Sequence, residues 1–315
     1  MTKRRLGRSD LFIEPLVVGT NSVGWTADEP TSFAVFDAFV AEGFNALDTA
    51  DSYSRWVPGN DSESEKIIGR WMRERGNRDK VLIFTKVGSD VGQGRRDLSA
   101  RHIEEAVEAS LKRLQTDYID LYQSHWPDPE TPQEETLLAH DRLIKAGKVR
   151  FIGVSNHDET LLAEALATSA RLGIARYETV QNEFNLYARN KFEGPVQDIC
   201  VREQISCIPY YGLASGFLSG KYRTETDAAK SVRGKGIVAK YLNERGRRIL
   251  AALDAVSART GAALAEIALA WVVAQPGVAA PIASATSLEQ VRSLVRGARL
   301  KLEPADLAAL TEAGR

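Results

Sequence analysis

Cysteine is scarce in this chain, and long apolar runs are missing from it. Only two cysteines occur among the 315 residues, Cys200 and Cys207, and they lack CxxC spacing. Neither a disulfide framework nor a cysteine metal site is therefore expected. No stretch approaches the roughly 18 continuous apolar residues of a membrane span, and the charged start MTKRRLGRSD lacks the apolar core of a signal peptide. These features predict a reducing, cytoplasmic location and no membrane association.

An excess of charge of either sign is also missing. Acidic and basic residues are interspersed and give a formal net charge of -1, so no face is expected to attract nucleic acid. A small neutral or anionic ligand is the expected partner. The composition, 43% hydrophobic and 26% charged, is that of a folded protein with a large core. The length suits one α/β barrel or two smaller domains.

Short β-branched runs alternate with longer amphipathic stretches, which is the pattern of parallel βα units. The strands are expected at PLVVGT (15–20), FNALDTA (44–50), VLIFTKV (81–87), IDLYQSH (119–125), VRFIGVS (149–155), YETVQNE (177–183), ISCIPY (205–210) and VAAPIAS (278–284). The first helix is expected to start with Thr31 as its N-cap, and a late one with a capping box of Ser287 and Gln290. Eight such units favour a closed (β/α)8 barrel over an open sheet, as a single domain over residues 1–315.

Two segments stand outside this alternation. The leading TKRRLGRSDLFI (2–13) has a turn-rich stretch at 7–10 between two short runs, which predicts a β-hairpin at the bottom of the barrel. Residues 212–240 are rich in Gly, Ser, Lys and Arg and too long for a connecting turn. They form either a functional lid or a disordered insert.

The chemistry of a barrel enzyme lies at the carboxyl ends of its strands. The second expected strand ends in Asp48 with Tyr53 one turn beyond, the third ends in Lys86, and the fourth ends in His125. Adjacent strands are only about 5 Å apart, so one rim is expected to carry all four side chains. Asp48 would hold Lys86, whose charge would lower the pKa of Tyr53, and His125 would orient a substrate oxygen. Such a set stabilises and protonates a carbonyl oxygen that gains negative charge.

Longer segments of the chain resemble the aldo-keto reductase superfamily. The matching runs are VVGTNSVGW, LDTADSY, FTKV, YQSHWPD, GKVRFIGVSN, VQNEFNLYAR, IPYYGLASGFLSGKY and PIASATSLEQV. The resemblance implies an Asp-Tyr-Lys-His tetrad, which falls on Asp48, Tyr53, Lys86 and His125. It also implies reversible reduction of a small-molecule aldehyde or ketone without a metal. The coenzyme would be NADPH, with NADH not excluded, and the barrel would bind it without a Rossmann domain.

The resemblance further implies which residues bind the dinucleotide. Ser155, Asn156 and Gln181 would hydrogen-bond the carboxamide, and Tyr210 would stack on the nicotinamide. The pyrophosphate would lie under Gly212, Leu213, Gly216, Leu218, Gly220 and Lys221, with added charge from Arg223. The adenosine ribose would contact Ser284, Thr286 and Gln290. The remaining cofactor-binding residues implied by the resemblance are Gly19, Thr20, Asn21 and Asp48.

The sequence departs from many family members at two positions of the ribose site, and the resemblance leaves the substrate pocket to be assigned. Ser284 and Gln290 stand where many members carry a Lys and an Arg that grip a 2′-phosphate, and Arg292 or Arg296 would have to replace that charge. The substrate pocket is expected to be walled by tryptophans that follow the first, second and fourth strands, namely Trp25, Trp56 and Trp126.

Other functions are compatible with the same residues. Potassium-channel β subunits resemble this family, so a cofactor-binding regulatory or redox-sensor subunit with slow turnover is the alternative. A second alternative is a lyase or isomerase that forms a Schiff base at Lys86. Tyr53 and the nicotinamide-site segments argue against this alternative. Sugars, xenobiotic aldehydes and ketosteroids all stay open as substrates, and so do the reaction direction and the oligomeric state.

Overall fold

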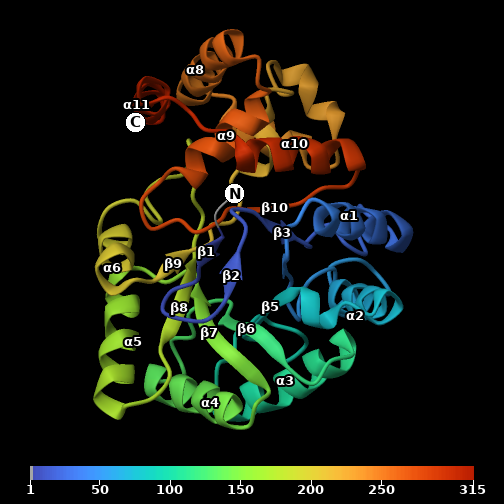
Figure 1. Cartoon of the computed structure of the whole chain (residues 1–315), viewed down its shortest axis with the longest axis vertical. Helices are drawn as coiled ribbons and strands as arrows, with labels where there is room; N and C mark the ends of the chain where they lie inside the picture. The colour runs from blue at the N-terminus through green and yellow to red at the C-terminus, as the bar shows by residue number, and fades with distance from the viewer. Residues whose placement is uncertain (1–2) are drawn as a thin grey trace.

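The computed structural model describes residues 3–315 and contains a sheet of eight parallel strands surrounded by helices (Figure 1). The strands are β3 (Val17–Gly19), β4 (Ala46–Asp48), β5 (Leu82–Val87), β6 (Ile119–Ser124), β7 (Val149–Ser155), β8 (Tyr177–Gln181), β9 (Ser206–Cys207) and β10 (Ile282–Ala283). Consecutive strands pair from β3 to β9, and β10 pairs with β3. All eight lie within the runs that the alternation predicted.

Backbone hydrogen bonds close the sheet between β9 and the segment that leads into β10. Cys207 donates its N–H to the carbonyl of Gly277 and accepts from the N–H of Ala279, both at 2.8 Å, and a parallel bridge joins Cys207 to Val278. The N–H of Ile282 donates to the carbonyl of Pro209 at 2.8 Å. Because the first and last strands are joined in this way, the strands form a barrel.

The N-terminal hairpin consists of β1 (Arg4–Arg5) and β2 (Phe12–Ile13), which pair antiparallel. Its buried side chains, Leu6, Leu11 and Ile13, share a core with residues at the amino ends of the barrel strands such as Ala46. Gly7 has φ +56° and approaches Glu178 so closely that a Cβ would lie 2.2 Å from its carboxylate, which explains a glycine there. The predicted (β/α)8 barrel with a hairpin at its bottom is confirmed, and Met1 and Thr2 of the expected N-terminal segment lie outside the described residues.

Helices cover the outside of the barrel (Figure 1). They are α1 (Glu29–Ala41), α2 (Glu63–Arg75), η1 (Arg78–Lys80), α3 (Ala100–Leu114), α4 (Gln133–Lys145), α5 (Glu159–Leu172), α6 (Pro195–Glu203), α7 (Gly234–Tyr241), α8 (Glu244–Thr260), α9 (Leu264–Val273), α10 (Leu288–Arg299) and α11 (Pro304–Ala313). In residues 3–315 no single helix is long and apolar enough to cross a membrane. Only α8 and α9 counted together have the length and composition of a membrane span, and they are bent by 100° to each other.

Two helix starts show how capping chemistry acts here. The expected N-cap Thr31 is wrong, because Asp28 caps α1 and its carboxylate accepts the N–H of Thr31 at 3.0 Å. Pro30 then falls in the first turn, where a missing N–H costs nothing. Ser287 does cap α10, but the Gln290 side chain accepts from the N–H of Thr286 rather than from Ser287, so the capping box is incomplete.

The long segment 212–240 is folded, so the expectation of a disordered insert is wrong. It contains η2 (Ala214–Ser219), η3 (Glu225–Lys230) and most of α7. Phe217, Leu218 and Tyr222 are fully buried and anchor the segment, and the hydroxyl of Tyr222 pairs with that of Ser231 at 2.8 Å. The segment is therefore an ordered cover at the carboxyl end of the barrel.

Candidate active site

A large cavity opens at the carboxyl ends of the strands. Its volume of about 1410 Å³ exceeds the roughly 300–1,000 Å³ of ordinary small-molecule pockets, which leaves room for a dinucleotide and a substrate together. The lining includes most of the predicted site residues: Gly19, Thr20, Asn21, Trp25, Asp48, Tyr53, Trp56, His125, Trp126, Ser155, Asn156, Gln181, Tyr210, Gly212, Leu213, Gly216, Lys221, Ser284, Thr286 and Gln290. Leu218, Gly220 and Lys86 are outside this lining, because Leu218 and Lys86 are fully buried and Gly220 caps the end of η2.

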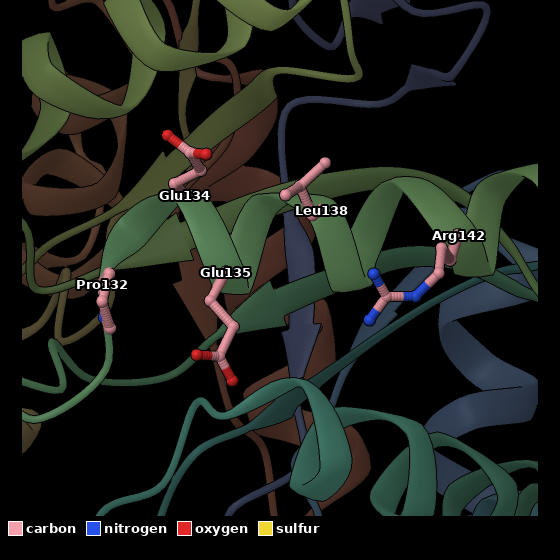
Figure 2. Close-up of a pocket in the computed structure, with 5 residues that line it drawn as sticks. All are labelled: Pro132, Glu134, Glu135, Leu138 and Arg142. Atoms are coloured by element: carbon pink, nitrogen blue, oxygen red, sulfur yellow. The ribbon is translucent and has the colours of Figure 1, made fainter.

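A smaller hollow of about 350 Å³ lies on the surface of α4 (Figure 2). Its lining is Pro132, Glu134, Glu135, Leu138 and Arg142. The charged side chains are engaged in surface contacts: Arg142 pairs with Glu104 at 2.8 Å, and Glu134 pairs with Arg171 at 2.5 Å. None of the predicted site residues lies there, so the large cavity is the candidate active site.

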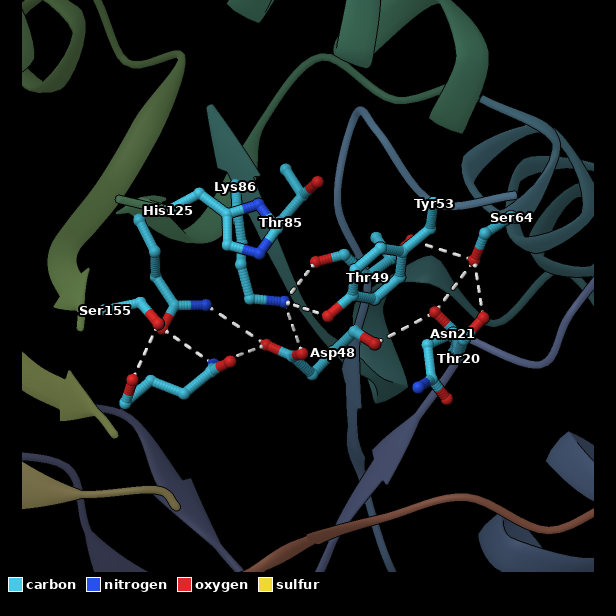
Figure 3. Close-up of polar contacts among 12 residues, drawn as sticks. Thr20, Asn21, Asp48, Thr49, Tyr53, Ser64, Thr85, Lys86, His125 and Ser155 are labelled. Carbon is cyan, nitrogen blue, oxygen red and sulfur yellow. Dashed lines mark hydrogen bonds and ion pairs between the residues drawn. The ribbon is translucent and has the colours of Figure 1, made fainter. Parts of the chain in front are cut away.

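Lys86 is the centre of the polar contacts in this cavity (Figure 3). Its ammonium donates to Asp48 Oδ2 at 2.6 Å, to the carbonyl of Thr49 at 2.7 Å and to the hydroxyl of Tyr53 at 3.0 Å. The other Asp48 oxygen accepts from the amides of Gln123 at 3.1 Å and Gln181 at 2.9 Å. Lys86 is fully buried behind Tyr53 and Asp48 is 1% exposed, so both charges have the partners that burial demands.

The protonation states of Lys86 and Tyr53 follow from this arrangement. Burial disfavours the Lys86 charge, but Asp48 and Tyr53 outweigh it, so the pKa of Lys86 is raised above its usual value. Burial raises the pKa of Tyr53, and Lys86 lowers it without overcoming burial. Lys86 thus lowers the pKa of Tyr53 as expected, but burial outweighs this effect and the net pKa is raised. Tyr53 is a neutral phenol that accepts a hydrogen bond from an ammonium, which leaves its own proton free for the cavity.

His125 lies beside Tyr53 on the same rim. Their ring centroids are 6.0 Å apart, and the imidazole stacks on Trp126 at 5.5 Å with an interplanar angle of 15°. The pKa of His125 is well below its usual value because of burial, with smaller effects from Lys86 and Arg96. His125 Nδ1 hydrogen-bonds the hydroxyl of Ser89 at 2.9 Å, a partner that sequence reasoning missed although Ser89 follows the same strand as Lys86. A neutral imidazole in a fixed orientation results.

Four polar residues from β7, β8 and the end of β9 interlock next to this tetrad. Ser155 donates its hydroxyl to the carbonyl of Gln181 at 2.6 Å, and Asn156 donates its amide to the carbonyl of His125 at 3.0 Å. The hydroxyl of Tyr210 donates to Asn156 Oδ1 at 2.8 Å. Asn156 has φ 60°, a left-handed conformation that Asn tolerates better than most residues. The predicted nicotinamide residues are thus brought together at the floor of the cavity.

The cover contributes two cations to the cavity lining, Lys221 and Arg233, and Lys221 lies in its glycine-rich part. Gly216 has φ +94°, and a Cβ there would face the Lys221 side chain at 3.8 Å. Lys221 lines the cavity. Arg223 is held instead by Asp254, with both guanidinium contacts at 2.8 Å. Of the two cations expected near a pyrophosphate, Lys221 lines the cavity and Arg223 does not.

The remaining end of the cavity lies between β10 and α10. The hydroxyl of Ser284 donates to Asn21 Oδ1 at 2.9 Å, and a Cβ at Gly19 would lie 2.8 Å from that hydroxyl. Arg296 is paired with Glu266 at 2.6 Å, and Arg292 and Arg296 are both outside the lining. Glu289 does line this end, and the sequence analysis did not single it out.

The three tryptophans predicted for a substrate pocket, Trp25, Trp56 and Trp126, all line the cavity, and other residues line it beside them. Trp25 and Trp56 meet edge to face with centroids 5.6 Å apart. Further lining comes from residues that the sequence analysis did not name, including Arg55, Ser89, Val91, Tyr211 and the run 231–233. In residues 3–315 there is no group of three or more His, Cys, Asp or Glu side chains placed to hold a metal ion.

Comparison with known proteins identifies the family. The family model described as "Aldo/keto reductase family" matches residues 15–315. The chain is similar to Protein tas of Escherichia coli, with 31% identity over 98% of this chain and 96% of that protein. It is 35% identical to aldo-keto reductase YhdN of Bacillus subtilis over 82% of this chain and 77% of that protein. It is also 31% identical to a probable voltage-gated potassium channel subunit beta of Oryza sativa over 92% of this chain and 89% of that protein. The resemblance in the sequence is confirmed: this chain belongs to the aldo/keto reductase family.

Proposed function

We propose that the protein is an NADPH-dependent oxidoreductase that reduces an aldehyde or ketone to an alcohol, with Tyr53 as proton donor. One observation carries this proposal: the Tyr53 hydroxyl lies on the cavity wall and accepts a hydrogen bond from the buried Lys86 ammonium at 3.0 Å. A phenol in this position has its proton directed away from Lys86. The same chemistry runs in reverse when an alcohol is oxidised.

The proposed roles follow from the contacts of each side chain. His125, neutral and fixed by Ser89, donates a hydrogen bond that orients the substrate carbonyl oxygen. As negative charge grows on that oxygen, Tyr53 transfers its proton, and the nearby Lys86 charge stabilises the phenolate that remains. Asp48 keeps Lys86 charged and in place. A bound nicotinamide dinucleotide supplies the hydride.

The donor set fits such a dinucleotide. Ser155, Asn156 and Gln181 offer amide and hydroxyl groups for a carboxamide, Tyr210 offers a ring face, and Lys221 a charge for phosphate. NADPH is the first candidate, on the strength of the family. NADH is the second, because Glu289 lines the ribose end, where its carboxylate repels a 2′-phosphate and accepts hydrogen bonds from a free ribose diol.

The coenzyme choice is tested by titrating the protein with NADPH and NADH and measuring the two dissociation constants. A Glu289→Gln variant is expected to tighten NADPH binding and leave NADH binding unchanged or weaker. Equal changes for both coenzymes would contradict a contact between Glu289 and the 2′ position.

The reaction itself is tested by following oxidation of each reduced coenzyme with a panel of aldehydes and ketones. Carbonyl-dependent oxidation is expected for at least one class of carbonyl compound. Absence of coenzyme binding would refute the proposal outright. We further propose that residues 1–315 act as one domain and that the protein works in the cytoplasm, where buried free thiols such as Cys200 and Cys207 stay reduced.

The second function is a cofactor-binding regulatory or redox-sensor subunit. The similarity to a potassium channel subunit beta supports it, and such a subunit needs the same cavity with slow turnover. Tight coenzyme binding combined with negligible oxidation by every carbonyl compound tested would favour this function over the reductase.

A further inference from the structure

Aromatic rings form a continuous wall on both sides of the proposed proton donor. From Tyr53 the wall runs through Trp56 to Trp25, with centroid distances of 6.3 and 5.6 Å. In the other direction it runs through His125 to Trp126, with distances of 6.0 and 5.5 Å. These are the distances at which aromatic rings attract one another. A flat ring system that enters beside Tyr53 therefore meets ring faces or edges along its whole length.

The wall extends to the mouth of the cavity, where apolar side chains are left in water. Trp56 is 51% exposed, Tyr211 is 41% exposed and Val232 is 86% exposed, and all three line the cavity. Exposed apolar groups gathered at a pocket mouth mark a surface that a ligand covers. A short aliphatic aldehyde held at Tyr53 leaves this rim uncovered, whereas a ligand with a long apolar body covers it.

The mouth also carries a guanidinium that has no carboxylate partner within residues 3–315. Arg233 lines the cavity and lies over the Trp25 ring at 5.7 Å. Two other charged side chains of the cavity lining are engaged: Arg55 pairs with Asp61 and donates to the carbonyl of Val91 at 2.6 Å, and Asp90 accepts the N–H groups of Gly92 and Gly94. Arg233 is thus free to bind an anion at the far end of the Trp25 wall.

We propose that the substrate is a planar aromatic aldehyde or ketone of at least two rings that carries a carboxylate or similar anion at the end remote from its carbonyl. This inference rests on the proposed carbonyl reduction at Tyr53. The rings lie along Trp56 and Trp25 while the carbonyl oxygen reaches Tyr53 and His125. Arg233 pairs with the anion, and the rim residues cover the apolar body. Arg233 is then the residue that sets the charge preference of the site.

The test compares three probes: 6-formyl-2-naphthoate, its uncharged methyl ester, and butanal. The two naphthaldehydes share the ring system and the reacting group and differ in the charge and one methyl group, so the change of their kcat/KM ratio on removing Arg233 reports the anion contact. The wild-type protein is expected to prefer the acid to the ester by about fivefold, the upper end of what one exposed ion pair provides, and either naphthaldehyde to butanal. The preference for the acid is expected to shrink as salt is added.

The variant Arg233→Gln is expected to bring the ratio of acid to ester close to one. The matched control is Arg223→Gln, which removes an arginine of the same segment that Asp254 holds outside the cavity, and it is expected to keep the wild-type ratio. A ratio near one in the wild type, or a ratio unchanged by Arg233→Gln, would overturn the anionic part of the inference. Turnover of butanal as fast as that of the naphthaldehydes would overturn the aromatic part.

A binding measurement separates this inference from the proposed reaction. Quenching of tryptophan fluorescence in the coenzyme-loaded protein gives the affinity for acid and ester without turnover. If no aldehyde is reduced, the proposed function fails. The anion contact at Arg233 then stands only if the acid binds about fivefold more tightly than the ester and loses that advantage in Arg233→Gln. Equal binding of acid and ester would reject it whatever the turnover.

Discussion

Asp51 is expected to destabilise the folded protein at neutral pH, and its replacement by asparagine to relieve that cost. The side chain is 2% exposed, and neither carboxyl oxygen has a hydrogen-bond partner within residues 3–315. Burial, together with the nearby Glu65 charge, raises the pKa of Asp51 to about 8, against smaller opposing effects of Arg113, Arg55 and Lys86. Asp51 therefore stays protonated in the folded state at pH 7.

The magnitude follows from the difference between the folded and unfolded states. The unfolded chain has the ordinary Asp pKa of 3.8 and the folded protein about 8, so between these values the folded state binds more protons and its stability falls as pH rises. Each pH unit in this window costs about 1.4 kcal/mol. From pH 5 to pH 7 the loss due to Asp51 is about 3 kcal/mol.

The assay is urea unfolding of the wild type and Asp51→Asn at pH 5 and pH 7. Asparagine has the same shape and no proton to lose, so the free energy of unfolding of the variant, relative to wild type, is expected to rise by about 3 kcal/mol between the two pH values. Any packing or hydrogen-bond change caused by the amide is present at both pH values and cancels. A relative stability that is the same at pH 5 and pH 7 would refute the raised pKa.

Three further predictions concern the cavity. Lys86→Met is expected to lower kcat/KM by at least about 100-fold, because Tyr53 loses its ammonium partner. Coenzyme affinity is expected to be retained, and an equal loss of affinity and activity would contradict a role of Lys86 in proton transfer. Gly19→Val is expected to weaken coenzyme binding, measured by titration, because even a Cβ lies 2.8 Å from the Ser284 hydroxyl and from Ile282, and unchanged binding would show that this end is not used. The low pKa of His125 predicts that kcat/KM shows no inflection near pH 6.5, and an inflection that disappears in His125→Gln would refute a neutral imidazole.

The barrel and the tetrad followed from local patterns in the sequence. The alternation of strands and helices gave all eight strand positions, and parallel strands bring their carboxyl ends to one rim, so Asp48, Lys86 and His125 had to meet. Tyr53, one turn beyond its strand, follows Asp48 to the same place. These inferences needed neither loop conformations nor burial.

What the sequence missed depends on tertiary structure. The direction of the Tyr53 pKa is decided by burial, which no local pattern reports. Arg223 and Arg296 were expected near phosphates, but Asp254 and Glu266, 30 or more positions away in sequence, bind them. The position of Arg233 at the mouth arises from the folding of the cover against Trp25. Long-range charge pairing and loop packing thus set the details of the site.

The measurement that tests the central claim most directly is the single-turnover rate of coenzyme oxidation in Tyr53→Phe, with the coenzyme bound in advance and an aldehyde in excess. The matched control is Tyr118→Phe, which removes the hydroxyl of a tyrosine that lies under Arg78 before the amino end of β6. We predict a fall of at least about 100-fold for Tyr53→Phe with unchanged coenzyme affinity, and the wild-type rate for Tyr118→Phe. A Tyr53→Phe rate equal to that of wild type would contradict the account.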